Sequence, residues 1–306
     1  MKTAENVVSD LISGLMVAFV AAHQFQPSLD GRRPIESVLL ARVEVQRRAD
    51  PPAIRVPPRQ DVPQHRVPGI EEVCLTTNGV RLAEMAPDLL ATGLRHLNLS
   101  LDSLRRDRYR ELTGFDHFDG VMAGLERAAA LGFAPIKINC VVLKDLNDDE
   151  LLDFARLTQD HPFQVRFIEF MPTVDEARWR RHFLPMAEIR RRLAKLGPLE
   201  AVAAPATAGP ARTFRVPGFR GELGFISSVS DHHCPTCNRL RLTAAGWLRP
   251  CLFAAPELDI KGPLRRGASE AALAQLFREA IRLKGCGSSA PLASPWPPPS
   301  MVSIGG

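Results

Sequence analysis

The chain has 306 residues, 45% of them hydrophobic, so it is long enough to bury a sizeable core in one large or two modest domains. Its net charge of +5 is mild, it has no block of Lys and Arg that resembles a nucleic-acid-binding arm, and aromatic residues make up only 6%. This composition argues against nucleic acid as a partner and suits an anionic small molecule. No apolar run reaches the ~18 residues of a membrane span, so we expect no membrane association.

The first 67 residues lack a steady hydrophobic period and end in a Pro/Arg-rich stretch, which predicts a linker or disordered segment. From residue 68 the pattern changes, and β-branched runs alternate with helical periodicity. Strands are predicted at 72–77, 94–101, 136–143 and 165–170, and helices at 82–90, 118–131 and 148–157. Asn147 and Glu150 predict a capping box at the start of the last of these helices. The alternation predicts an α/β fold with a parallel sheet.

The second half of the chain has shorter elements. Residues 185–198 predict a basic helix, an Ala/Pro-rich connector follows at 201–211, and residues 270–283 predict a closing helix before a Pro/Ser/Gly-rich tail. Four strands are too few to close a barrel, so we expect the strand at 72–77 to be an unprotected edge.

Polar residues occupy the predicted strands and their carboxyl ends, where reactive groups gather in parallel β/α folds. Asn98, Ser100 and Asp102 share one face of their strand, and Lys137 shares a face with Asn139. A lysine inside such a strand predicts either an anionic ligand in a barrel lumen or a sheet whose polar face is in water. The spacing leaves both interpretations open.

Three of the six cysteines cluster at Cys234, Cys237 and Cys251. Clustering in a long chain favours a metal site over a disulfide framework, which indicates a cytoplasmic protein. The spacing alone favours structural zinc, with His232 or His233 as fourth ligand, and a [4Fe–4S] cluster is the alternative.

Two arginines follow directly, at Arg239 and Arg241, and point the same way if the segment is extended. Their guanidinium groups match phosphate geometry, and the alternative is a solvated strand face.

Six motifs occur in one order along the chain: LTTNG at 75–79, LNLSLD at 97–102, KIN at 137–139, NDDE at 147–150, RFIEFMP at 166–172 and CPTCNRLR to LRPC across 234–251. In this combination the chain resembles the MoaA-type GTP 3′,8-cyclases, which are radical-SAM enzymes of molybdenum-cofactor synthesis. The resemblance runs from about residue 68 to 283, and the terminal Gly305-Gly306 matches again.

The resemblance implies a fold and a division of the chain. The expected fold class is an incomplete radical-SAM-type β/α barrel followed by a small α+β iron–sulfur domain of the twitch type. The expected parts are an unmatched N-terminal segment at 1–67, the partial barrel at 68–184, the iron–sulfur and GTP-binding domain at 185–284 and a flexible tail at 285–306.

The resemblance also implies site residues. The metal ligands are Cys234, Cys237 and Cys251, which would hold one [4Fe–4S] cluster whose open iron meets GTP. The implied contacts to GTP are Thr76, Lys137, Arg239 and Arg241, with Arg166 near the substrate. Ser100 and Met171 are implied contacts to S-adenosylmethionine.

One part of the family pattern is missing from the 306 residues. The family's first cluster is held by a C-x3-C-x2-C loop followed by a Gly-Gly-Glu-Pro segment, whereas the first cysteine here is Cys74 and no Gly-Gly-Glu-Pro is present. We therefore assign no catalytic residue and expect the chain to be inactive as it stands. The alternative is an iron–sulfur or zinc module that binds GTP or serves as a scaffold, and a homodimer is left open.

Overall fold

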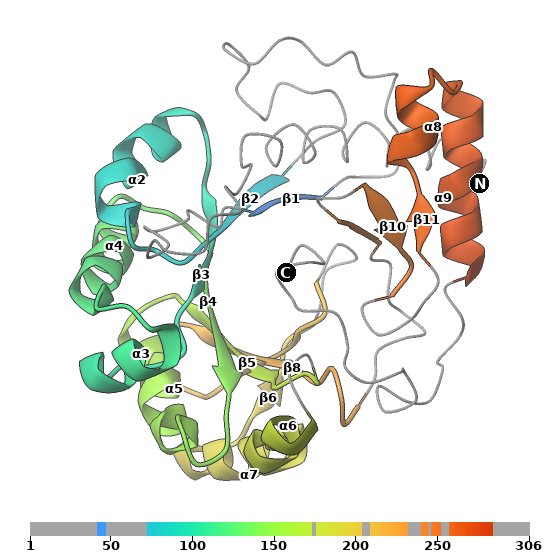
Figure 1. Ribbon diagram of the computed structural model, residues 1–306. Coiled ribbons are helices and arrows are strands. Elements are labelled where there is room, and N and C mark those ends of the chain that lie inside the picture. The colour runs from blue at the N-terminus through green and yellow to red at the C-terminus, as the bar shows by residue number, and fades with distance from the viewer. Residues whose placement is uncertain are drawn as a thin grey trace.

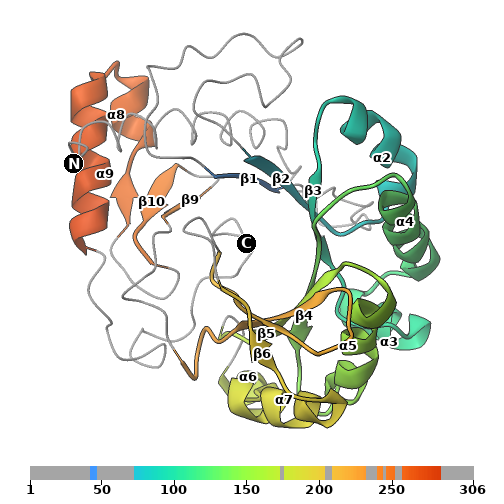
Figure 2. The same cartoon turned by 180° about the vertical axis from the view of Figure 1, so that it is seen from behind.

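The computed structural model describes residues 42–46, 72–172, 176–203, 209–231, 240–243, 246–251 and 257–283, with backbone alone for 42–46, 72 and 241. Within these ranges one eight-stranded sheet curves through the molecule, and most of the helices lie on its convex side (Figure 1). A smaller unit with three strands lies on the far side of the molecule from α2 and α4 in both views (Figures 1 and 2).

The large sheet is mostly parallel. Its strands, in spatial order, are β1 (Arg42–Gln46), β2 (Glu72–Thr77), β3 (His96–Ser100), β4 (Ile136–Val142), β5 (Gln164–Glu169), β8 (Glu222–Ile226), β7 (Arg212–Arg215) and β6 (Glu200–Ala201). The five strands from β2 to β8 in this order pair in parallel, and β1, β7 and β6 each pair antiparallel with their neighbours. Among the described strands β1 and β6 form the two edges, so the sheet is a partial barrel.

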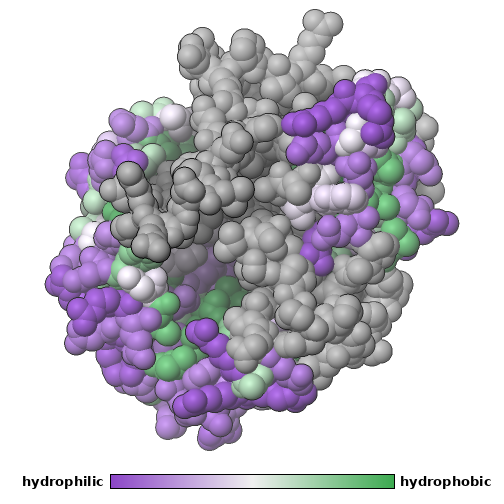
Figure 3. All heavy atoms as spheres, in the orientation of Figure 1, coloured by the Kyte–Doolittle hydropathy of each residue, from purple (hydrophilic) through white to green (hydrophobic). Residues whose placement is uncertain are grey.

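The helices of this unit are α2 (Leu82–Ala91), α3 (Arg106–Thr113), α4 (Phe118–Ala130), α5 (Leu151–Asp160), α6 (Glu176–His182) and α7 (Met186–Leu193), with 3-10 turns at Asp148–Glu150 and Ala194–Leu196. The strand residues that face them, such as Leu97, Ile138 and Phe167, are fully buried. The outer helices present a largely hydrophilic surface (Figure 3). No helix in the described part of the chain is long and apolar enough to cross a membrane.

Two glycines, Gly79 and Gly124, allow the turn after β2 to pack closely against its neighbours. Gly79 has φ of +78°, and a Cβ there would lie 2.4 Å from Leu99 Cδ1, so a larger residue would disrupt the turn. Gly124 of α4 approaches the same turn, where a Cβ would lie 3.0 Å from the Gly79 carbonyl oxygen. The turn after β2 is therefore packed directly against β3 and α4.

The smaller unit has a core of its own. It consists of β9 (Arg241–Leu242), β10 (Trp247–Arg249), β11 (Leu258–Asp259), α8 (Lys261–Arg265) and α9 (Glu270–Leu283). Leu248 and Phe277 are almost fully buried between the small antiparallel sheet and α9.

The predicted α/β class and partial barrel are confirmed, and β2 and α9 have the predicted bounds. Two expectations are wrong. The edge at β2 is paired by β1. The capping box is absent, because the Asn147 side chain makes no cap hydrogen bond and its Oδ1 accepts the Leu143 N–H at 2.7 Å. The Glu150 carboxylate instead accepts the Ser103 hydroxyl at 2.8 Å. Both side chains are used in tertiary contacts, which local spacing does not reveal.

Candidate functional site

Two rows of residues cross the face of the large sheet that points away from the helices. The Thr76 row is defined by Thr76, Asn98, Lys137 and Gln164, which are register partners on β2, β3, β4 and β5. The Ser100 row is defined by Ser100, Asn139, Arg166 and Gly224, which are register partners on β3, β4, β5 and β8. Side chains two positions apart share a face, so both rows line the same surface. The sheet thereby brings together four of the predicted site residues.

Hydrogen bonds hold several of these side chains in place. Asn98 Nδ2 donates to Thr76 Oγ1 at 3.1 Å, and Arg166 Nε donates to Gln164 Oε1 at 2.6 Å, which joins the two rows. Gln164 Nε2 in turn donates to Glu222 Oε2 at 3.2 Å. Lys137 lies between Asn98 and Gln164 in register and is partly exposed. A cation held at the centre of a polar surface can receive an anionic or carbonyl-bearing ligand.

The side chain of Arg166 depends on a glycine in the next strand. A Cβ at Gly224 would lie 2.9 Å from Arg166 Cγ, which is shorter than an ordinary van der Waals contact. Because Gly224 has no side chain, the Arg166 side chain has room to lie against β8. Together with the bond to Gln164, this contact orients the guanidinium group.

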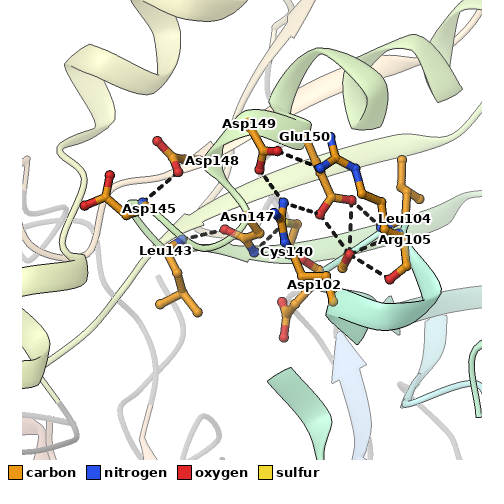
Figure 4. A network of polar contacts seen from close by, with 12 residues as sticks. Asp102, Leu104, Arg105, Cys140, Leu143, Asp145, Asn147, Asp148, Asp149 and Glu150 are labelled. Atoms are coloured by element: carbon orange, nitrogen blue, oxygen red, sulfur yellow. Dashed lines mark hydrogen bonds and ion pairs between the residues drawn. The ribbon is translucent and has the colours of Figure 1, made fainter. Parts of the chain in front are cut away.

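A buried polar network ties the loop after β3 to the loop after β4 (Figure 4). Fully buried Glu150 accepts the Ser103 hydroxyl at 2.8 Å and the Leu104 N–H at 2.6 Å. Asn147 Nδ2 donates to the carbonyl oxygens of Asp102 and Val141, at 2.7 and 2.9 Å. The NDDE motif thus positions the chain segment that directly follows Ser100.

Asp102 lies two residues after the end of β3. Its Oδ1 accepts the Val141 N–H at 2.8 Å, which attaches the side chain to β4. Burial disfavours the charged form and raises the pKa of Asp102 to about 6, although the Val141 hydrogen bond opposes the shift. The carboxyl group therefore titrates close to physiological pH.

Glu169 at the end of β5 anchors a distant segment. Its fully buried carboxylate accepts the N–H groups of Met186 and Val229 at 2.7 Å each, and that of Ser230 at 2.9 Å. The Ser230 hydroxyl donates to the same carboxylate. Met171 lies two residues after Glu169, partly buried, beside Phe170, whose carbonyl oxygen accepts the Trp179 indole N–H at 2.9 Å. In the sequence, Cys234 follows Ser230 by four positions.

The cysteines have different environments. Cys251 follows β10 and is partly exposed without a disulfide, whereas Cys140 is buried and its pKa is raised well above the ordinary value by burial. Cys140 therefore stays protonated, which makes it a poor metal ligand. Three thiols in a C-x2-C…C arrangement fit an iron–sulfur cluster in donor chemistry, and with a histidine they also fit zinc.

The other predicted ligands are outside what the structure describes. Cys234, Cys237, Arg239 and both candidate histidines lie at 232–239, and of Arg241 only the backbone is described, paired with Arg249. Among the described residues there is no group of three or more His, Cys, Asp or Glu side chains that could hold a metal ion.

The sequence analysis assigned no site role to Glu169 or Asn139, and to Glu150 only a role in helix capping. Each lies within a motif that carried the family resemblance, so the motifs contained a signal for them. The partners of the two glutamates are far away in sequence, 61 residues for Glu169 and Ser230 and 47 for Glu150 and Ser103, and local periodicity cannot reveal such contacts.

Comparisons with known proteins agree with this architecture. A family model of the Radical SAM superfamily matches residues 36–158, beginning inside the N-terminal segment, and a model named Molybdenum Cofactor Synthesis C matches residues 163–289. A GTP 3′,8-cyclase of Moorella thermoacetica is 48% identical over 218 residues, covering 71% of this chain and 68% of the relative.

Two further relatives extend the comparison. A GTP 3′,8-cyclase of Pelotomaculum thermopropionicum is 44% identical over 220 residues, covering 71% of this chain and 68% of the relative. Molybdenum cofactor biosynthesis protein 1 of Bos taurus is 41% identical over 217 residues, covering 71% of this chain and 34% of the relative. The chain belongs to the GTP 3′,8-cyclase family of radical SAM proteins.

Proposed function

We propose that the chain acts in molybdenum cofactor biosynthesis by binding GTP on the polar face of its partial barrel. The observation that supports this most is the strand register, which places Thr76 on β2, Lys137 on β4 and Arg166 on β5 along one face of the sheet. Relatives named GTP 3′,8-cyclase match 71% of the chain. Lys137 and Arg166 would attract the nucleotide by charge, and Thr76 would offer a hydroxyl group.

The remaining site residues complete the proposal. Ser100 and Met171 would contact S-adenosylmethionine, and Arg239 and Arg241 would bind the phosphates of GTP. Cys234, Cys237 and Cys251 would hold one [4Fe–4S] cluster, because three thiolates leave one iron with an open coordination position. When bound, that cluster would supply a Lewis-acidic iron for an atom of GTP.

These 306 residues by themselves bind the substrate without generating a radical from S-adenosylmethionine. Reductive cleavage needs a cluster on the C-x3-C-x2-C thiolates, and that motif does not occur in the sequence. Positioning a substrate cannot replace an electron donor.

The test is GTP binding by the anaerobically reconstituted 306-residue chain, measured by calorimetry. Loss of one charge-assisted hydrogen bond corresponds to ~10–100-fold in affinity, and we expect a loss in this range for Lys137→Ala. Lys144→Ala is the matched control, because Lys144 is exposed just beyond β4 and should bind like the unaltered chain. Equal affinity of both variants would contradict the proposal.

A second assay addresses the radical step. Under strong reductant the same preparation should form no 5′-deoxyadenosine from S-adenosylmethionine. Turnover above a cluster-free control would show that one cluster serves both roles. If the protein retains zinc, takes up no iron and binds no GTP, the cysteines form the structural zinc site that their spacing alone favours, and the chain serves as a scaffold.

A further inference from the structure

A groove open to solvent lies at the end of the large sheet where β6 forms the edge. It has a volume of about 730 Å³ and is lined by α7, through Arg190, Arg191 and two alanines, and by residues 197–199, which lead into β6. Helix α7 lies at this end of the sheet in both views (Figures 1 and 2). The groove therefore combines positive charge with a sheet edge.

One cation of this groove is oriented without an anionic partner. Arg190 Cζ lies 4.6 Å from the ring centroid of Phe214 and 5.7 Å from that of Phe225. Phe225 is the register partner of fully buried Phe167, so these rings are on the helix-covered side of the sheet, opposite the polar face. Stacking on two rings orients the guanidinium group. The other two arginines of α7 pair with Glu188, whereas the Arg190 guanidinium has no ion pair with any described carboxylate.

Beside this cation, β6 ends the sheet with an open side. The Val202 N–H donates to the Thr213 carbonyl oxygen at 2.9 Å. Hydrogen-bonded and non-hydrogen-bonded pairs alternate in an antiparallel ladder, so the next pair, Ala201 and Phe214, is not hydrogen-bonded. The N–H and C=O of Ala201 therefore point away from β7. Ala201 is exposed, and among the described strands none pairs with the outer side of β6.

The open edge and the cation lie on the same side of the sheet. Ala201 and Phe214 are register partners, so the side chain of Ala201 is on the face where Arg190 covers the Phe214 ring. A strand added to β6 would lie about 10 Å from β7, or two strand spacings. A long acidic side chain on that strand can span this distance toward the guanidinium group. Acid is favoured, because α7 and the 3-10 turn after it contain four basic residues and one acidic residue.

We propose that the β6 edge and the adjoining groove bind an extended acidic segment of a partner protein. The segment would pair with the backbone of Ala201, as in strand addition to other open sheet edges, and place a carboxylate against Arg190. The ion pair of Arg191 with Glu188 is exposed and contributes only about 0–1 kcal/mol, so a second carboxylate can displace it. This surface is on the opposite side of the sheet from the polar face, so the proposal does not depend on GTP binding.

A fluorescent peptide of alternating Glu and Val is the probe, and anisotropy measures its binding to the full chain. A peptide with Lys in place of Glu should not bind, and salt should weaken binding of the acidic one. Arg190→Met keeps a long side chain over Phe214, removes the charge and should lower affinity about 10–100-fold. Arg180→Met is the matched control. Arg180 also lies over a ring, that of Trp179, but it pairs with Glu176 and is not part of the groove, so affinity should not change.

Backbone pairing is tested from both sides. Ala201→Pro removes an outward N–H and no hydrogen bond to β7, so it should weaken binding about fivefold with little change in the unfolding midpoint. An N-methylated form of the acidic peptide cannot donate to the edge and should not bind, and this test leaves the protein unaltered.

Three results would overturn the proposal. The first is no binding of the acidic peptide, or equal affinity of Arg190→Met and the unaltered chain. The second is equal binding of the N-methylated peptide together with full displacement by inorganic phosphate, which would show an anion site only. The third is self-association of the chain that Ala201→Pro abolishes, without peptide binding, which would assign the edge to a second copy.

Discussion

The backbone N–H of Ser230 donates to Glu169 Oε2 at 2.9 Å, although the two residues are 61 positions apart in the chain. Glu169 ends a central strand, and Ser230 lies four residues before Cys234. A single buried carboxylate therefore joins residues 229–230, which precede the cysteine cluster in the sequence, to the end of β5, two residues before Met171.

Replacing Glu169 with Gln should lower the free energy of unfolding by about 2–3 kcal/mol, because the amide nitrogen would face N–H donors that the carboxylate accepts. Urea titration at neutral pH measures the change. Glu188→Gln is the control, since Glu188 pairs with Arg191 and Arg192 on the surface of α7 and should leave the midpoint nearly unchanged. Equal effects of both variants would contradict the anchoring role.

A methyl group at Gly224 should disturb ligand binding through Arg166. The added Cβ would lie 2.9 Å from Arg166 Cγ, so the guanidinium group must move and GTP affinity should fall several-fold. Calorimetry on Gly224→Ala measures the loss. Gly209→Ala has no described atom within 4 Å of the new Cβ and should bind normally. Normal binding by Gly224→Ala would mean that Arg166 does not contact the nucleotide.

Asp102 should make stability depend on pH. Its pKa rises from 3.8 to about 6 on folding, so its contribution is fully present below pH ~4 and is lost as pH rises through about 6. The loss amounts to roughly 2–3 kcal/mol. Urea unfolding of Asp102→Asn and the unaltered chain should show a difference that grows in favour of the variant between pH 4.5 and 7.5. A difference that stays constant across this range would contradict the raised pKa.

Iron uptake should depend on only some of the cysteines. Changing Cys251 or Cys237 to Ala should abolish the uptake of about four irons during anaerobic reconstitution, because three thiolates hold one cube. Cys140→Ala is the matched control and should retain uptake, since the buried Cys140 thiol stays protonated. Iron and sulfide analysis with absorption spectra measures both outcomes. Uptake that survives in Cys251→Ala would remove Cys251 from the ligand set.

The sequence by itself determined the alternating strands and helices from Glu72 to Glu169, the residue types on each strand face and the three-cysteine cluster. These features depend on residues a few positions apart, where side-chain periodicity and turn chemistry act directly. The tail helix at Glu270–Leu283 followed from the same periodicity.

Only the tertiary structure decided which polar residues meet. The register that aligns Thr76 with Asn98 and Asn139 with Arg166 arises from how whole strands pair. The pairing of β1 with the outer side of β2 arises in the same way. The partners of Glu150 and Glu169 were hidden for the same reason. A buried carboxylate is stabilised by hydrogen-bond donors that the fold brings from distant segments, and a local sequence pattern cannot identify those donors.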